Sequence, residues 1–171
     1  VAQSKEKEIS YRDYIAANTS PSTGGELFKE NFFKPAPYVL TRKLGAKGRP
    51  LAVFFEQRDC PSCAELHEKV LPDKETRAII RKLDVIQLDM WSSTPVVTPQ
   101  GKRQTVREWA KALDVKYAPT IVLFDQQGQE IIRSEAFFKV FHTQGIFAYV
   151  AEGGYKTEPD FQRYLSARAE H

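Results

Sequence analysis

Residues 51–71 read LAVFFEQRDCPSCAELHEKVL: an apolar run, then two cysteines three positions apart, then side chains with helical spacing. The run at 51–55 has the length and composition of a buried strand. After the cysteines, apolar side chains recur every three or four positions until Pro72 interrupts them. The sequence therefore predicts a strand that leads into Cys60 and a helix that starts beside it.

This arrangement gives the two cysteines different chemical roles. Cys60 would lie at the N-terminus of the helix, where free backbone N–H groups and the helix dipole favour a thiolate over a thiol. We therefore expect Cys60 to be the nucleophile. Cys63 lies within the first helical turn, close enough to attack a mixed disulfide at Cys60 and release the partner. The motif predicts disulfide exchange by the Cys60–Cys63 pair itself, with no added cofactor and no metal.

Length and composition fit one domain with a substantial core, because the chain has 171 residues of which 42% are hydrophobic. The formal net charge is only +3. Basic residues are scattered, apart from a small group that we interpret as a solvated connection: Arg42, Lys43, Lys47 and Arg49. A nucleic-acid site would need a basic stripe joined to stacking aromatics or a reading element, and we expect no nucleic-acid partner.

Nothing in the sequence has the length and apolar character of a membrane span or a signal peptide. We expect a soluble protein, with no membrane insertion, from which a signal could have been removed. Two cysteines in a CxxC motif do not decide the cellular compartment, because the motif works in the cytosol and in oxidising spaces.

The rest of the chain alternates strand and helix patterns. Asp73 can cap a second helical segment after the break at Pro72. Further elements are predicted as strands at 85–89, 120–124 and 130–133, a helix from Thr105 to Leu113, and helices around 146–150 and 161–165. We also expect a short helix at 38–44 and a long loop at 91–104. This order describes an α/β protein, with a mixed sheet and helices on both faces.

The cysteine motif, together with Tyr117-Ala118-Pro119-Thr120 before an apolar strand, resembles the thioredoxin superfamily over about residues 36–153. The resemblance implies a thioredoxin fold, flanked by a lead-in arm at 1–35 and a helical extension at 154–171. It also implies that Pro119 is cis and faces the dithiol. Ala118, Pro119 and Thr120 would then bind an extended segment of the substrate.

Further stretches resemble periplasmic SoxW-type thioredoxins: Phe55-Glu56-Gln57, Leu66-His67-Glu68, Leu88-Asp89-Met90-Trp91 and Phe161-Gln162-Arg163-Tyr164-Leu165. The pattern from Phe124 to Glu130 is similar to the C-terminal thioredoxin-like domain of DsbD. These resemblances imply a periplasmic reductase of protein disulfides, associated with bacterial sulfur oxidation and supplied with electrons by a membrane thiol donor. We expect it to work as a monomer.

Two residues before the motif depart from ordinary thioredoxins. Those proteins carry a buried aspartate six residues before the first cysteine, whereas Phe54 stands there in this chain. Glu56 is the nearest substitute: it shares a face of the strand with Phe54 and either reaches the site or faces solvent. Asp59 replaces the usual tryptophan, and its charge would raise the pKa of Cys60, whereas Arg58 and the helix terminus would lower it.

The dipeptide between the cysteines favours a reductase. Pro61 fits the first helical position, where a missing N–H costs nothing. Ser62 is neutral, whereas strong oxidants of the DsbA kind carry a histidine there that stabilises the thiolate, and with it the reduced form.

Other residues leave a second class of function open. His67 follows Cys63 by four positions, so it is either a third ligand for Cu(I) or Zn(II) or a packed helix residue, and we favour the packed residue. The segment 91–104 either borders the site and selects partners or is an ordinary insertion. The alternative to an enzyme is an adaptor or metallochaperone that uses the same two thiols.

Overall fold

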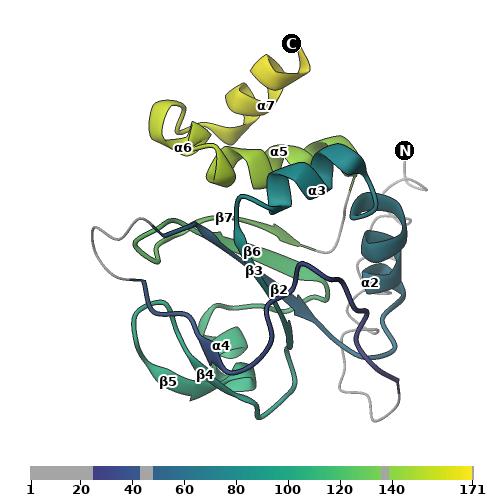
Figure 1. The fold of residues 1–171 in the computed structure, drawn as a ribbon, viewed down its shortest axis with the longest axis vertical. Helices are drawn as coiled ribbons and strands as arrows, with labels where there is room; N and C mark the ends of the chain where they lie inside the picture. The colour runs from purple at the N-terminus through teal and green to yellow at the C-terminus, as the bar shows by residue number, and fades with distance from the viewer. Residues whose placement is uncertain (1–24, 43–47, 136–138, 171) are drawn as a thin grey trace, which may run out of the picture.

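A four-stranded sheet forms the centre of the protein. The computed structural model describes residues 25–42, 48–135 and 139–170. The strand order is β3-β2-β6-β7 (Figure 1). β2 (Leu51–Glu56) and β3 (Asp84–Asp89) run parallel, whereas β6 (Thr120–Phe124) is antiparallel to β2 and to β7 (Glu130–Glu135). The predicted mixed sheet is confirmed.

Helices cover both faces of this sheet (Figure 1). On one face lies α4 (Val106–Ala112), whose Trp109 packs edge-on against Phe55. On the other face lie α3 (Lys74–Ile80) and α5 (Val140–Ala151). Side chains alternate along β2, so Phe54 and Phe55 point to opposite faces of the sheet. Phe54 packs in the core on the face covered by α3 and α5, where it stacks on Phe147. Phe55 packs in the core on the face covered by α4.

The helix after the cysteines is broken, as predicted. It begins as α2 (Pro61–Glu65), continues as the π-helix η1 (Leu66–Val70), and stops before Pro72. Asp73 then caps α3, because its carboxylate accepts hydrogen bonds from the backbone N–H groups of Glu75 and Thr76, at 2.9 and 3.1 Å.

The predictions for 38–44 and 91–104 were wrong. Tyr38–Val39 forms a strand, β1, instead of a helix, and residues 43–47 lie outside the described residues. β1 pairs in parallel with β4 (Pro95–Val97), which pairs antiparallel with β5 (Arg103–Thr105). The expected loop therefore contains a hairpin that forms a second sheet with β1. This parallel pairing joins distant parts of the chain, and no local pattern signals it.

The described part of the predicted lead-in, residues 25–35, lies against the domain, while residues 1–24 fall outside the described residues. The ring of Phe33 packs edge-on against Phe54 in the core. The Lys34 N–H donates to the Val85 carbonyl at 2.8 Å, and Gln87 Nε2 donates to the Phe28 carbonyl at 2.6 Å. This segment therefore covers the edge of the sheet at β3, which no other strand of that sheet pairs with.

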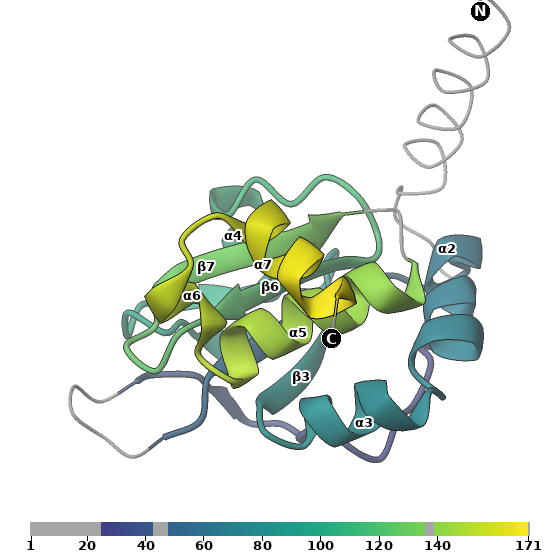
Figure 2. The ribbon, with the colours of Figure 1, turned by 90° about the horizontal axis from the view of Figure 1, so that it is seen from above.

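The predicted C-terminal extension contains α6 (Gly154–Thr157) and α7 (Phe161–Ala169), and α7 lies over α5 (Figure 2). Gly145 in α5 lies at this contact, where a Cβ atom would come within 2.5 Å of Leu165 Cδ1 and force that side chain to shift. Within the described residues, no helix has the length and apolar character needed to cross a membrane.

Candidate active site

The two cysteines are joined in a disulfide at the N-terminus of α2, with their Cα atoms 5.1 Å apart. β2 ends at Glu56, and a short connection brings Cys60 to the N-cap position. Pro61 follows at the first helical position, as predicted for a residue without an N–H. The backbone N–H of Cys63 donates to Cys60 Sγ at 3.0 Å, so the helix terminus points a donor at this sulfur.

A buried turn faces Cys60 from the other side. The Ala118–Pro119 peptide bond is cis, and the Ala118 carbonyl oxygen lies 3.7 Å from Cys60 Sγ. Thr120 closes the turn, because its hydroxyl donates to the Tyr117 carbonyl at 2.6 Å. Of the three residues expected to bind substrate, Ala118 thus lies against Cys60, and Pro119 and Thr120 continue the same turn into β6.

Access to the two sulfurs is unequal. Cys60 retains 6% of its surface, whereas Cys63 retains 0%. Pro61 is exposed and Ser62 is half-buried, so they form the outer side of the motif. Both cysteines are buried in this state, and of the two only Cys60 keeps any exposed surface.

The connection before the motif is fixed by contacts with the segment after β3. Gln57 is buried and accepts a hydrogen bond from Trp91 Nε1 at 2.7 Å. Arg58 forms an ion pair with Asp89 at 3.6 Å. Asp59 has a positive φ of 49°, a left-handed conformation that aspartate tolerates better than most residues. The start of segment 91–104 therefore holds the chain that leads into Cys60.

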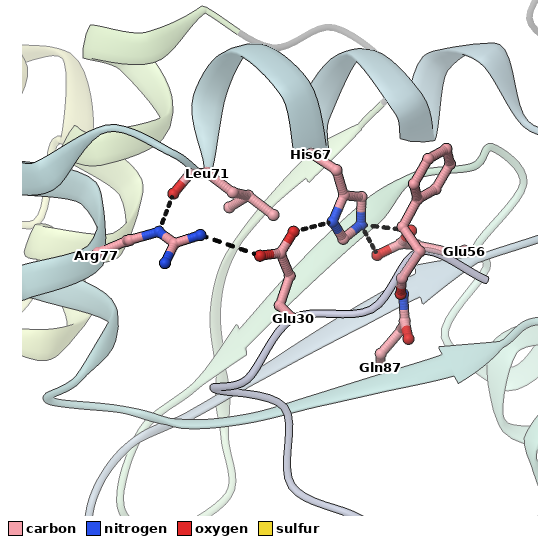
Figure 3. A network of polar contacts seen from close by, with 7 residues as sticks. Glu30, Glu56, His67, Leu71, Arg77 and Gln87 are labelled. Carbon is pink, nitrogen blue, oxygen red and sulfur yellow. Dashed lines mark hydrogen bonds and ion pairs between the residues drawn. The ribbon is translucent and has the colours of Figure 1, made fainter.

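Glu56 faces the interior, so the solvent-facing alternative is wrong. Its exposed fraction is 0%, and both of its carboxylate oxygens lie close to His67 Nε2, at 2.8 and 2.9 Å (Figure 3). His67 is itself buried. The strand pattern placed Glu56 on the correct face, but it did not show that a histidine from the following helix would be its partner.

Glu30 of the lead-in completes a buried network around His67 (Figure 3). Its carboxylate lies 2.8 Å from His67 Nδ1 and also contacts Arg77 of α3 at 3.2 Å. The Phe28 ring stacks on the imidazole, with centroids 5.1 Å apart. Sequence reasoning missed Glu30, because a lone carboxylate in a polar segment carries no signal of a distant buried partner.

The pKa values of the central pair are shifted in the same direction. Burial, the largest effect, raises the pKa of Glu56 above its ordinary value, although the hydrogen bond and the charge of His67 oppose this rise. Burial disfavours a charge on His67, but hydrogen bonds and charges of Glu56 and Glu30 outweigh it and raise the pKa of His67. The pair therefore holds protons more tightly than the isolated side chains would.

Both ring nitrogens of His67 contact carboxylates, and its side chain is not directed at the cysteines as a metal ligand. Across the parts of the chain that the structure describes, no three His, Cys, Asp or Glu side chains are grouped so that they could hold a metal ion. His67 is therefore a packed and hydrogen-bonded helix residue in this state.

The family model of the thioredoxin-like domain matches residues 40–144, more than half of the chain. The match spans both cysteines and the turn at Pro119, whereas Glu30 and α7 lie outside it. No curated protein matches the sequence.

Two solved structures are similar to this chain. A thioredoxin-fold protein from Helicobacter pylori has a TM-score of 0.62 and 17% identity, covering 84% of this chain and 92% of that one. A thioredoxin from Thermus thermophilus has a TM-score of 0.50 and 21% identity, covering 64% of this chain and 80% of that one. At these identities the similarity establishes the fold, which is the predicted α/β arrangement, and nothing finer.

Proposed function

Because the chain belongs to the family of thioredoxin-like domains, we propose that it reduces disulfide bonds in other proteins. The broader class, thiol-disulfide oxidoreductase, fits the fold and the Cys60–Cys63 pair. The narrower proposal is a periplasmic reductase, supplied with electrons by a membrane thiol donor. It draws on the resemblance to SoxW-type thioredoxins in the residues around the cysteine motif.

The geometry that supports this function best is the position of Cys60 at the N-cap of α2. In the reduced protein, the N–H of Cys63, 3.0 Å from Cys60 Sγ in the disulfide form, would donate to a Cys60 thiolate. The helix dipole also favours a negative charge there. Both effects lower the free energy of the thiolate relative to the thiol, which is the requirement for a nucleophilic cysteine.

The reaction then has two steps. The Cys60 thiolate attacks a substrate disulfide, forms a mixed disulfide and releases the first substrate sulfur as a thiolate. Cys63 loses its proton and attacks Cys60 Sγ, which forms the Cys60–Cys63 disulfide and releases the second substrate sulfur. Two electrons pass to the substrate, and a membrane dithiol would return the protein to its reduced form. Ala118 would pair with the substrate backbone beside Cys60.

The direction of electron flow is proposed from Ser62. The residue is half-buried between the cysteines and has no charge with which to stabilise the Cys60 thiolate. A less stable reduced form corresponds to a more negative reduction potential, which suits a reductase.

Two measurements test this function. We expect the purified protein to reduce insulin when dithiothreitol is supplied, and we expect Cys60→Ser to abolish this activity. We also expect a reduction potential near the thioredoxin value of about −270 mV in defined thiol-disulfide buffers. A potential of about −120 mV would identify an oxidant and overturn the proposal. Cys63→Ser should accumulate mixed disulfides, and its failure to trap any would exclude the exchange mechanism.

A further inference from the structure

The first described stretch of the lead-in, residues 25–31, which we call the strap, runs beside the helix that carries the two cysteines (Figure 1). At its start, a Cβ atom on Gly25 would lie 2.7 Å from Asp59 Oδ1 and 3.6 Å from the Asp59 backbone nitrogen. Three residues later the Phe28 ring stacks on His67, with centroids 5.1 Å apart. The strap therefore touches the chain directly before the dithiol and again one helical turn after it.

One buried side chain, His67, fastens the strap to the domain. Its Nδ1 lies 2.8 Å from Glu30 Oε2 of the strap, and its Nε2 lies 2.8 Å from Glu56 Oε1 of β2 (Figure 3). A neutral imidazole has one N–H donor and one acceptor nitrogen, so it cannot donate to both carboxylates. The docked arrangement therefore needs one proton more than a neutral histidine between two ionised glutamates, placed either on the ring or on a carboxylate.

Glu30 is the partner that can leave when this proton is lost. Glu56 has no exposed surface and is fixed in β2, where it pairs with β3. Glu30 retains 12% of its side-chain surface, and it also contacts Arg77 of α3 at 3.2 Å, whose side chain is 37% exposed. An ionised carboxylate that faces the lone pair of a neutral ring is repelled in the interior, whereas water solvates it well. Loss of the proton therefore favours movement of Glu30, and of the strap with it, toward solvent.

The rest of the strap is held lightly. Glu26 and Lys29 are 82% and 86% exposed and form an ion pair with each other at 3.7 Å. The Phe28 carbonyl accepts a hydrogen bond from Gln87 Nε2. Directly after the strap, Phe33 packs in the core and provides a fixed end. Segments with exposed backbone and few buried apolar contacts open most easily, so the strap can open while the domain stays folded.

We propose that the strap is a pH-sensitive cover of the active site, which docks and restricts the access of protein substrates to Cys60 while its network is protonated, and opens on proton loss. Its part in substrate access rests on the proposed function, whereas its docking does not. Cys60 has an exposed fraction of only 6% in the docked state. Opening would free the Asp59 side of the nucleophile, because Gly25 lies against Asp59. The exchange reaction itself is unchanged, and the strap alters how often a partner reaches Cys60.

The strap opens as pH rises. The charged groups that face His67 are Glu56 of β2, Glu30 of the strap and, behind Glu30, Arg77 of α3. Burial lowers the pKa of His67, but the hydrogen bonds and charges of the two glutamates outweigh burial, and the pKa is raised. An open strap removes the contribution of Glu30, so the pKa of His67 falls on opening. Between these two pKa values opening releases one proton, and the open population rises by up to about tenfold per pH unit.

Trypsin cleavage after Lys29 measures opening, because the rate follows the open population when closing is fast compared with cleavage. Each rate on the full-length protein is divided by the rate on a free peptide of the same residues 25–35. This division removes the pH dependence of trypsin and the effect of a substitution beside the cleaved bond. We expect the wild-type quotient to rise with pH above about 6.5. For Glu30→Gln it should be about tenfold higher at neutral pH, because a charge-assisted hydrogen bond is lost, and for His67→Gln it should depend much less on pH.

Alkylation of Cys60 measures access without disulfide exchange. In reduced Cys63→Ser protein, the rate with a bulky polyethylene-glycol maleimide is divided by the rate with N-ethylmaleimide, which cancels the ionisation of the Cys60 thiol. This maleimide quotient should rise with pH in parallel with tryptic cleavage. Adding Glu30→Gln should raise it about tenfold at neutral pH, because the bulky reagent reacts with the open form.

Matched variants test for a general effect of charge. Glu65→Gln removes an exposed carboxylate of α2, and His142→Gln removes a histidine of α5 whose ring packs on Phe161. Both should keep the wild-type pH profiles. Circular dichroism confirms that each variant is folded.

The outcomes separate the strap from the proposed function. If opening of the wild type does not change with pH, or if Glu30→Gln and His67→Gln keep its profile, His67 does not fasten the strap and the inference is wrong. If the strap opens but the maleimide quotient stays constant, its role in access is wrong. Failure of the wild type to reduce insulin would overturn the proposed function alone, because neither readout of the strap depends on disulfide exchange.

Discussion

Ser62 is the residue through which the potential of the dithiol is most directly adjustable. It is half-buried between the two cysteines, beside the helix terminus that holds Cys60 Sγ. In Ser62→His, an imidazolium beside the Cys60 thiolate would stabilise the reduced form. We expect the reduction potential to rise by about 30 mV or more, equivalent to about 1.4 kcal/mol, as measured in glutathione buffers.

A control separates this local effect from a general change of charge. Ser166→His places the same side chain on an exposed position of α7 and should leave the potential unchanged. A Ser62→His potential equal to that of the wild type would mean that the residue between the cysteines does not set the stability of the thiolate here.

His67 should make stability depend on pH. Its pKa in the folded protein is raised, so its contribution to stability is fully present below its unfolded pKa of about 6.5 and is lost as pH rises through the folded value. The raised pKa of Glu56 acts with the same sign. We expect the free energy of unfolding in urea to fall as pH rises above about 6.5, and to fall less in His67→Gln.

His142→Gln is the comparison for this experiment, because it removes a histidine of α5 whose ring packs on Phe161 instead of on carboxylates. It should keep the slope of the wild type. Equal slopes for wild type and His67→Gln would show that the imidazole does not exchange its proton with folding in this range.

Glu56 shows how far single residues can be predicted. Alternation along β2 fixed the face on which Glu56 lies, because Phe54 had to point into the core and two positions separate them. The hydrogen-bond partner of Glu56, His67, could not be predicted, because burial of a carboxylate at a strand end depends on the segments that cover it. One of those segments is the lead-in, which is distant in sequence and brings Glu30 to His67. The cysteine motif needed no such context, since its chemistry depends on adjacent residues.

At the scale of elements, local signals succeeded where one segment decides its own structure. The break at Pro72, the cap at Asp73 and the start of a helix at Thr105 all lie where the sequence analysis predicted them. The strands β1 and β4 were not predicted, because each is too short to show the alternation of a strand and each depends on the other for its hydrogen bonds. The sequence signal available for the hairpin after β4 was the glycine at position 101. In the structure Gly101 has a positive φ of 87°, a turn conformation that favours glycine.

The cap at Asp73 also connects two helices. Besides the N–H groups of Glu75 and Thr76, its carboxylate accepts a hydrogen bond from Gln144 Nε2 of α5 at 2.6 Å. In Asp73→Ala we expect the free energy of unfolding to fall by about 2 kcal/mol, from the lost cap and the unpaired Gln144 amide. Asp73→Asn keeps an acceptor oxygen and should lose much less. Equal losses in urea denaturation would assign the effect to charge instead of capping.

At the scale of the whole molecule, the family match covers the sheet and the dithiol but not the segments that flank them. It begins at residue 40, so the lead-in with Glu30 and Phe33 lies before it, and α7 lies after it. Both flanking segments pack on the same face of the sheet, over η1 and α5. The lead-in supplies Glu30 to the buried network around His67, so this chain adds to the family's common domain a segment that packs into its interior.

This integration predicts that the lead-in and the domain unfold together. Phe33 is one of the side chains that join them, because its half-buried ring meets both Phe54 in the core and His67 in the network. For Phe33→Ala we expect a loss of about 2 kcal/mol in the free energy of unfolding, with one cooperative transition in urea. Val39→Ala, at an apolar side chain that is 63% exposed, should change stability by less than about 0.5 kcal/mol. If Phe33→Ala unfolds at the wild-type midpoint, the lead-in is an independent arm whose ring contacts with Phe54 and His67 add nothing to the stability of the domain.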